Sequence, residues 1–137
     1  MSTAKVRLEF HAISARLREM PLPEVDVVVG IARGGIVPAA MAAHQLGVPL
    51  VLLQINYRDD DNKPRRAAPE LLGPLSFDPV GKRVLLVDDV SVTGATFSKA
   101  REILFGASIT TLACKGRADL VLFPEIRTCV DWPWRVD

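Results

Sequence analysis

The sequence predicts an α/β domain with a central, mainly parallel sheet flanked by helices. Three mainly apolar runs, of which the first is rich in β-branched residues, predict strands: VDVVVGI (25–31), VPLVLLQINY (48–57) and KRVLLVDD (82–89). Helical patterns alternate with these runs, which favours parallel pairing. With 137 residues the chain can form one core, so we expect a single domain over residues 1–137.

The helices follow from residue spacing and from the residues that end them. Ile13, Leu17 and Met20 recur at helical spacing and predict an amphipathic helix over residues 10–20. Gly47 is a natural ending for a second helix of small, apolar residues. The remaining predicted elements are that second helix over 36–47, a third over 93–105, and strands over 108–115 and 119–123.

A long charged connection interrupts this pattern. Residues 58–79 hold four prolines and one glycine among acidic and basic side chains. Long loops in compact domains are usually functional or mobile, so we predict a mobile loop over about residues 57–79.

Composition excludes several classes of protein. The 17 basic and 16 acidic residues give a net charge of +1, which offers no electrostatic basis for nucleic-acid binding. No apolar run approaches the length of a membrane span, and the first residues lack the pattern of a signal peptide. Cys114 and Cys129 are expected to be reduced thiols, and their spacing from His11 and His44 fits no metal site. We therefore expect a cytoplasmic protein without membrane or nucleic-acid partners.

The segment DDVSVTGAT predicts a phosphate site beside two acids. Asp88 and Asp89 end a buried strand, and the loop over residues 90–96 leads into a helix. Gly94 permits close backbone approach, and free N–H groups at a helix start favour an anion. The paired carboxylates can accept hydrogen bonds from a vicinal diol or hold Mg²⁺. The alternative is a solvated turn. Loop hydroxyls that can add hydrogen bonds are those of Ser91, Thr93 and Thr96.

A second candidate anion site is VVVGIARGGIVPA. Gly34 and Gly35 open a helix directly after a buried strand, so backbone amides can face an anion. Arg33, in the same turn, can bind an oxyanion through two donors. Taken alone, the pattern also fits a glycine-rich turn with a surface arginine.

Residues 84–97 resemble the signature of the type I phosphoribosyltransferases, which use 5-phosphoribosyl 1-pyrophosphate (PRPP). The resemblance implies that family's fold, including a small C-terminal hood. It also implies that Asp88 and Asp89 engage the ribose hydroxyls with Mg²⁺ nearby. The 5-phosphate loop would then consist of Val90, Ser91, Val92, Thr93, Gly94, Ala95 and Thr96.

The same resemblance assigns the second turn to pyrophosphate. In the family, a strand followed by Ser/Ala-Arg-Gly-Gly binds pyrophosphate, often after a cis peptide bond. Here that turn would be Ala32, Arg33, Gly34 and Gly35, with the cis bond at Ala32–Arg33. Arg33, Asp88 and Asp89 are then the expected catalytic residues.

A wider likeness, over roughly residues 25–134, is to xanthine-guanine-type purine phosphoribosyltransferases. It implies that Lys115 contacts the purine 6-oxo group, that Cys129 and Val130 line the base pocket, and that residues 115–137 form the hood. Trp132 and Trp134 are interpreted as packing or interface residues. A dimer interface could involve the N-terminal helix, the ITTLAC segment or these tryptophans.

Two positions depart from the purine pattern. Val92 stands where these enzymes usually carry an aspartate that handles the purine proton, and a valine cannot do so. Cys129 stands where the family has a tryptophan that stacks on the base. The ribose, phosphate and pyrophosphate elements are intact, so recognition of PRPP is expected to persist while recognition of the base is altered.

Three functions follow. The first is an Mg²⁺-dependent enzyme that transfers phosphoribose from PRPP to a purine such as guanine, xanthine or hypoxanthine, or to a non-purine base, and releases pyrophosphate. Its partners would be PRPP and a nucleobase or nucleoside monophosphate, and the family is commonly a homodimer or homotetramer. The second is a regulatory protein that senses PRPP or a nucleotide. The third is an α/β domain with a coincidental motif.

Overall fold

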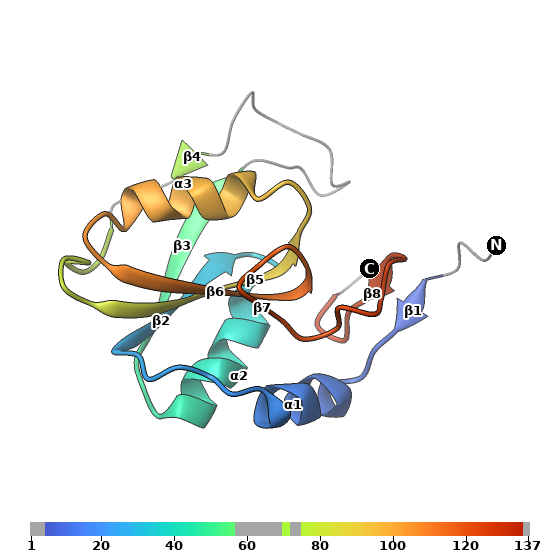
Figure 1. Cartoon of the computed structure of the whole chain (residues 1–137). Coiled ribbons are helices and arrows are strands. Elements are labelled where there is room, and N and C mark those ends of the chain that lie inside the picture. Colours follow the sequence, from blue (N-terminus) through green and yellow to red (C-terminus); the bar gives the residue numbers. More distant parts are fainter. Residues whose placement is uncertain (1–4, 57–69, 72–74, 136–137) are drawn as a thin grey trace.

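The chain folds around a six-stranded sheet with strand order β4-β3-β2-β5-β6-β7. The computed structural model describes residues 5–56, 70–71 and 75–135. Helix α3 covers one face of the sheet, and α1 and α2 cover the other (Figure 1). All neighbours in the sheet are parallel except β3 and β4, which confirms the predicted fold class. The elements of the sheet layers are β2 (Val27–Ala32), β3 (Leu50–Asn56), β4 (Glu70–Leu71), β5 (Arg83–Ser91), β6 (Ser108–Gly116), β7 (Leu120–Val121), α1 (Phe10–Glu19), α2 (Ile36–Leu46) and α3 (Ala95–Ile103).

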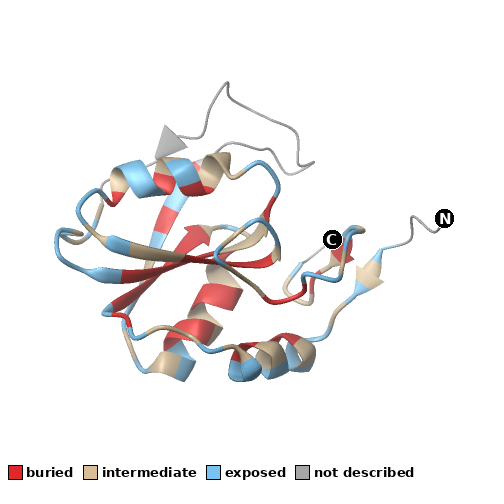
Figure 2. Ribbon diagram, viewed as in Figure 1, coloured by how far each residue is buried: buried red, intermediate tan, exposed pale blue. Residues whose placement is uncertain are grey.

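The middle segments of the central strands are apolar because both of their faces are covered. On β5, Val84 and Leu86 pack toward α3, while Leu85 and Val87 pack toward α1 and α2. Figure 2 shows the buried residues concentrated along the middle strands and on the sides of the helices that face them. Two hydrophobic layers therefore cover the two faces of the sheet, as the apolar runs predict.

The boundaries of two elements near the acid pair differ from prediction. Strand β5 continues through the acids to Ser91, because Val90 and Ser91 pair with the end of β6. Helix α3 starts at Ala95 rather than at residue 93, since Gly94 adopts a left-handed conformation with φ of 83°. The phosphate loop predicted over 90–96 is thus shorter than expected, with only Val92–Gly94 between strand and helix.

A second, two-stranded sheet joins the two ends of the chain. Strand β1 (Val6–Arg7) pairs in parallel with β8 (Val130–Asp131), and Val6 N donates a hydrogen bond to the carbonyl of Cys129 at 2.9 Å. Two-residue strands carry no readable alternation, so the sequence did not predict them. The C-terminal segment is therefore held by the N-terminal one.

Much of the loop predicted over 57–79 lies outside the described residues. Within the described part, Glu70–Leu71 forms β4, antiparallel to the end of β3. Leu75 and Phe77 pack against the core on the α3 side, so this end of the segment is anchored.

Among the described residues, no helix is long and apolar enough to cross a membrane.

Candidate functional site

The two predicted anion-binding turns lie side by side at one edge of the sheet. Strands β2 and β5 are hydrogen-bonded neighbours, and each is followed by its glycine-rich turn. From β2 the chain crosses by α2 to β3 on one side, whereas from β5 it crosses by α3 to β6 on the other (Figure 1). Such a reversal opens a crevice at the carboxyl ends of the strands, where α/β proteins bind ligands.

The first turn is folded tightly onto the sheet. Gly35 N donates a hydrogen bond to the carbonyl of Ile31 at 2.8 Å, and the Ala32–Arg33 peptide bond is cis, as the resemblance implies. A Cβ at Gly35 would lie 2.6 Å from the carbonyl oxygens of Ile31 and Val87. Only glycine fits there. The amide of Gly35 is thus used within the turn and does not serve as one of the backbone donors that we expected to face an anion. The side chain of Arg33 is exposed.

The other glycine of this turn, Gly34, contacts the acid pair. A Cβ at Gly34 would overlap the carboxylate of Asp89, so the acid lies directly against the glycine backbone. The carboxyl end of β5 and the turn after β2 therefore form one continuous site.

The acid pair is partly shielded from water. Asp88 Oδ1 accepts a hydrogen bond from the amide of Asp89 at 2.8 Å, and Asp89 Oδ1 accepts one from the amide of Val90 at 2.7 Å. Desolvation, together with the negative charge of Asp89, raises the pKa of Asp88 well above its ordinary value. Such crowding favours a cation or a diol, either of which relieves the repulsion.

The second turn leads into α3 with a short local bond. The side-chain hydroxyl of Thr93 accepts a hydrogen bond from the amide of Ala95 at 3.2 Å, which orders the start of the helix. Ser91, before the turn, is only 6% exposed. Its hydroxyl has no hydrogen-bond partner within the described part of the chain. A buried hydroxyl without a partner is expensive, so it suits a position beside a ligand oxygen.

The end of β6 is fastened to the same turn. Lys115 pairs across the strands with Val90, and Gly116 pairs with Ser91. A Cβ at Gly116, where φ is 103°, would overlap the carbonyl of Ser91, and Arg117 N donates to that carbonyl at 2.8 Å. The backbone of Lys115 therefore lies beside the end of β5 that leads into the second turn.

The C-terminal residues predicted to line the base pocket have different environments. Cys129 is exposed, whereas Val130 is buried in the core on the α1 and α2 side, where it pairs with Val6. The rings of Trp132 and Trp134 stack at 5.2 Å with 5° between their planes, and Trp132 belongs to the core. This agrees with the interpretation that the tryptophans pack rather than bind a base.

Sequence reasoning missed a clamp that holds this C-terminal segment. Arg16 of α1 binds Glu125 through an Nη2–Oε2 contact of 2.6 Å and donates to the carbonyl of Leu122. Its guanidinium also lies 4.5 Å from the ring centre of Phe123. Residues more than a hundred positions apart form these contacts, so no local pattern reports them.

A cysteine behind the acid pair was also missed as part of the site. Cys114 is buried on β6, and desolvation followed by the charges of Asp89 and Asp88 raises the pKa of its thiol. Its neutral thiol adds no negative charge behind the carboxylates. Neither Cys114 nor Cys129 is in a disulfide, as predicted.

The residues at this edge fit Mg²⁺ only with help from a substrate. Among the described residues, no group of three or more acidic, cysteine or histidine side chains could hold a metal ion. Mg²⁺ commonly takes one or two carboxylates and completes its shell with water and substrate phosphates. The pair formed by Asp88 and Asp89 meets that requirement.

Comparison with known proteins agrees with this geometry. The chain matches the family described as phosphoribosyl transferase domain over residues 11–114. It is similar to a purine phosphoribosyltransferase from Pyrococcus horikoshii Ot3, with 28% identity, a TM-score of 0.78, and coverage of 97% of this chain and 95% of that one. It is also similar to the orotate phosphoribosyltransferase of Aeropyrum pernix, with 25% identity, a TM-score of 0.53, and coverage of 81% and 61%.

A third similar structure has a different ligand. It is a hypothetical protein from Neisseria gonorrhoeae with bound ppGpp, at 21% identity and a TM-score of 0.64, with coverage of 98% of this chain and 92% of that one. At this identity the likeness shows the shared fold.

Proposed function

Because this chain belongs to the phosphoribosyltransferase family, we propose that it transfers the phosphoribosyl group of PRPP to a purine base and releases pyrophosphate. It is an enzyme of the phosphoribosyltransferase class. The observation that carries the proposal is the contact between Gly34 and Asp89, which joins the pyrophosphate turn to the ribose acids.

Different residues would bind the ribose, the 5-phosphate and the pyrophosphate of PRPP. Asp88 and Asp89 accept hydrogen bonds from the ribose hydroxyls, while Ser91 and the turn before α3 hold the 5-phosphate with hydroxyls and helix N–H groups. Arg33 binds the departing pyrophosphate. The bond between the anomeric carbon and pyrophosphate breaks as a base nitrogen bonds to that carbon. The 5-phosphate would be held by the end of β5, the turn and the start of α3, which are Val90, Ser91, Val92, Thr93, Gly94, Ala95 and Thr96.

Mg²⁺ is the cofactor that we propose, held by Asp88 and Asp89 together with oxygens of PRPP. When bound, it neutralises charge on the departing pyrophosphate. The adjacent carboxyl groups of Asp88 and Asp89 at the end of β5 support this assignment, because Mg²⁺ commonly takes one or two carboxylates together with substrate phosphates and water.

The residues that would contact the acceptor base differ from those of the usual purine enzymes. Lys115 lies beside the phosphate turn and would contact an oxo group of guanine, xanthine or hypoxanthine. Val92 is 64% exposed and supplies neither a proton acceptor nor a hydrogen bond at its side chain. Its apolar surface, with the exposed Cys129, also fits a non-purine base.

We further propose that the enzyme acts in the cytoplasm as a homo-oligomer.

Val92 also favours a second candidate function. Without a proton acceptor at that position, the protein would bind PRPP or a nucleotide as a sensor, and the bound form would regulate a partner. The protein would then bind the donor without turnover.

The experiment that tests the proposal is calorimetric titration with PRPP and Mg²⁺, followed by a panel of bases with pyrophosphate release monitored. Release with guanine, xanthine or hypoxanthine supports the enzyme, and release with another base alone identifies a non-purine acceptor. Binding without release from any base supports the sensor, and no binding overturns both. Asp89→Asn should lose binding, whereas the matched variant Glu102→Gln, on the exposed side of α3, should retain it.

A further inference from the structure

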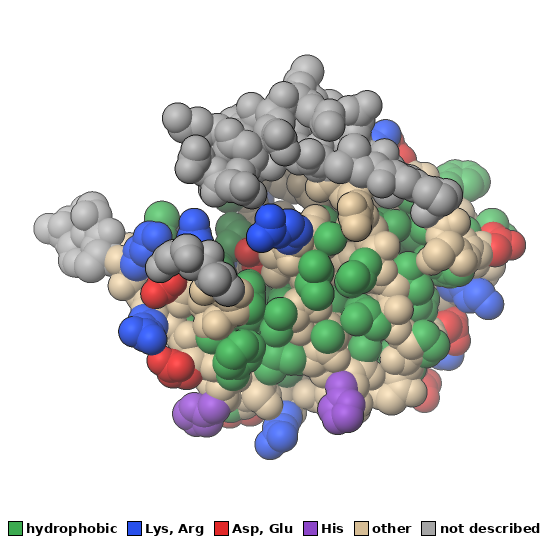
Figure 3. All heavy atoms as spheres, turned by 180° about the vertical axis from the view of Figure 1, so that it is seen from behind, with side chains coloured by type: hydrophobic (Ala, Val, Ile, Leu, Met, Phe, Trp, Pro, Cys, Tyr) green, Lys and Arg blue, Asp and Glu red, His purple; other side chains and the backbone are tan. Residues whose placement is uncertain are grey.

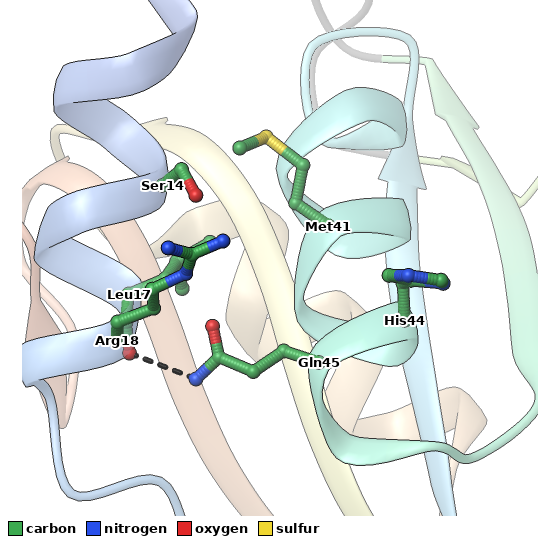
Figure 4. Close-up of a pocket in the computed structure, with 6 residues that line it drawn as sticks. All are labelled: Ser14, Leu17, Arg18, Met41, His44 and Gln45. Atoms are coloured by element: carbon green, nitrogen blue, oxygen red, sulfur yellow. Dashed lines mark hydrogen bonds between the residues drawn. The ribbon is translucent and has the colours of Figure 1, made fainter.

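A groove lies between α1 and α2, on the face of the sheet opposite α3 (Figure 4). It has a volume of about 380 Å³, which is within the range of sites that bind small molecules. None of its residues belongs to either glycine-rich turn, so it is separate from the site proposed for PRPP. The residues that line it are Ser14, Leu17, Arg18, Met41, His44 and Gln45.

Part of the groove wall is apolar. Leu17 is buried in the core, and Met41 packs against the same core from α2 while remaining partly exposed. Viewed from behind, hydrophobic side chains gather over the middle of this side of the molecule, and both histidines lie along one edge with a basic side chain between them (Figure 3). A small molecule in the groove can therefore bury an apolar group against Leu17 and Met41.

The two arginines of α1 have different surroundings. Residues two positions apart on a helix do not share a side, and Arg16 binds Glu125 with an Nη2–Oε2 distance of 2.6 Å. The side chain of Arg18 has no ion pair or hydrogen bond within the described part of the chain. Its guanidinium extends into the space between α1 and α2 (Figure 4). The groove thus contains a positive charge, and no acidic side chain lines it.

Further hydrogen-bond donors come from both helices. The hydroxyl of Ser14 and the imidazole of His44 make no side-chain hydrogen bond to any residue that the structure describes. An imidazole carries an N–H donor whether it is neutral or charged. Gln45 Nε2 donates a hydrogen bond to the carbonyl of Leu17 at 3.0 Å, which holds the two helices at this spacing. The groove is therefore formed before any ligand arrives.

We propose that this groove binds a small organic anion, with its carboxylate on Arg18 and its apolar body against Leu17 and Met41. A guanidinium binds a carboxylate through two parallel hydrogen bonds, and the groove has no acidic side chain to repel it. A cation would be repelled by Arg18. An uncharged apolar molecule would remove water from the guanidinium without replacing its hydrogen bonds.

Titration of the isotope-labelled full chain, followed by NMR of its amide groups, tests the proposal. Phenylacetate is the probe, because it joins a carboxylate to an apolar ring, and phenylacetamide is its neutral counterpart. We expect saturable shifts in residues 14–18 and 41–45 with phenylacetate, and about tenfold weaker binding of phenylacetamide. Equal affinities would overturn the proposal, as would the absence of saturable shifts. Shifts confined to residues 32–35 and 91–96 would also overturn it, because the probe would then occupy the glycine-rich turns.

A pair of variants tests whether the charge of Arg18 is responsible. Arg18→Gln should weaken binding of phenylacetate about tenfold. Arg127→Gln removes an exposed charge outside the groove and should bind the probe like the wild type. Equal weakening in both variants would show that net charge governs binding and would contradict the proposal.

The comparison of the two probes on the wild type needs no variant, so it decides the question even if Arg18→Gln fails to fold, which its NMR spectrum would report. The inference does not depend on catalysis. Failure of the transfer assay would therefore leave it standing.

Discussion

The carboxylate of Asp89 occupies the space that a side chain at Gly34 would need. The two residues belong to different strand–helix turns and are 55 positions apart by number. This contact brings the predicted pyrophosphate turn against the predicted ribose acids, so we expect the stabilities of the two turns to be coupled.

A double-mutant cycle measures that coupling. Gly34→Ala should destabilise the protein, because the new methyl group overlaps Asp89, and should cost much less in an Asp89→Ala background. We expect a coupling free energy of about 1 kcal/mol or more from urea denaturation. Gly35→Ala is the control, because its methyl group would meet backbone carbonyls of Ile31 and Val87. Equal costs of Gly34→Ala in both backgrounds would contradict the contact.

Asp88→Asn should stabilise the fold and impair the enzyme. Burial and Asp89 raise the pKa of Asp88, so the folded state binds this proton more tightly than the unfolded chain does. Stability of the wild type therefore falls as pH rises from the unfolded pKa, about 3.9, through the folded pKa. The variant avoids that loss.

Thermal unfolding across pH checks this expectation. The advantage of Asp88→Asn should be largest at neutral pH and should vanish as pH falls toward the unfolded pKa. Transfer or PRPP binding should meanwhile drop on the order of 100-fold. A variant that is less stable than the wild type at neutral pH would mean that Asp88 is not a crowded, desolvated acid.

Val92→Asp should raise transfer to hypoxanthine or guanine. A carboxylate at this position can take the proton of the base, and positioned acid–base groups commonly contribute about 100-fold or more. Because Val92 is exposed, the change should leave the fold intact. Val92→Asn, which is similar in shape but cannot accept the proton, should stay at the wild-type rate. Equal activity in both variants would show that proton handling is not what Val92 removes.

Arg16→Ala should loosen the C-terminal segment and lower the free energy of unfolding more than Arg18→Ala does. Arg16 binds Glu125 and the carbonyl of Leu122, whereas Arg18 is an exposed neighbour on the same helix. Its hydrogen bond holds the pKa of Glu125 below the ordinary value. That part of the effect is present above the unfolded pKa of Glu125 and is lost as pH falls through the folded pKa. Urea denaturation of both variants at two pH values tests it, and similar costs for both would contradict the clamp.

The sequence predicted most of the central fold because its information there is local. The stretches 27–29 and 84–87 have apolar side chains at every position, which is typical of strands that are covered on both faces. Gly94 and Gly47 likewise predict the start of α3 and the end of α2, because glycine readily adopts the left-handed conformation found there. Short strands such as β1 and β8 escaped prediction, since two residues give no period and their pairing depends on the whole fold.

The two glycine-rich turns of the candidate site were predictable for the same reason, since each is a contiguous stretch of the sequence. Contact between Gly34 and Asp89, the position of Cys114 behind the acids, and the Arg16 clamp depend on which strands become neighbours. The extent of β5 was also misjudged, because two acids suggest a strand end, whereas pairing with β6 carries the strand on to Ser91.

The pairing of β1 with β8 has a consequence for how the molecule is made. Residues 27–116 contain the sheet core and both glycine-rich turns, and they are synthesised before β8. Strand β1 is synthesised before this part, yet it can pair only after β8 has been made. The sheet core and its two turns are thus able to form during translation before the two-stranded sheet is completed. A nascent chain that ends before residue 130 would lack the partner of β1.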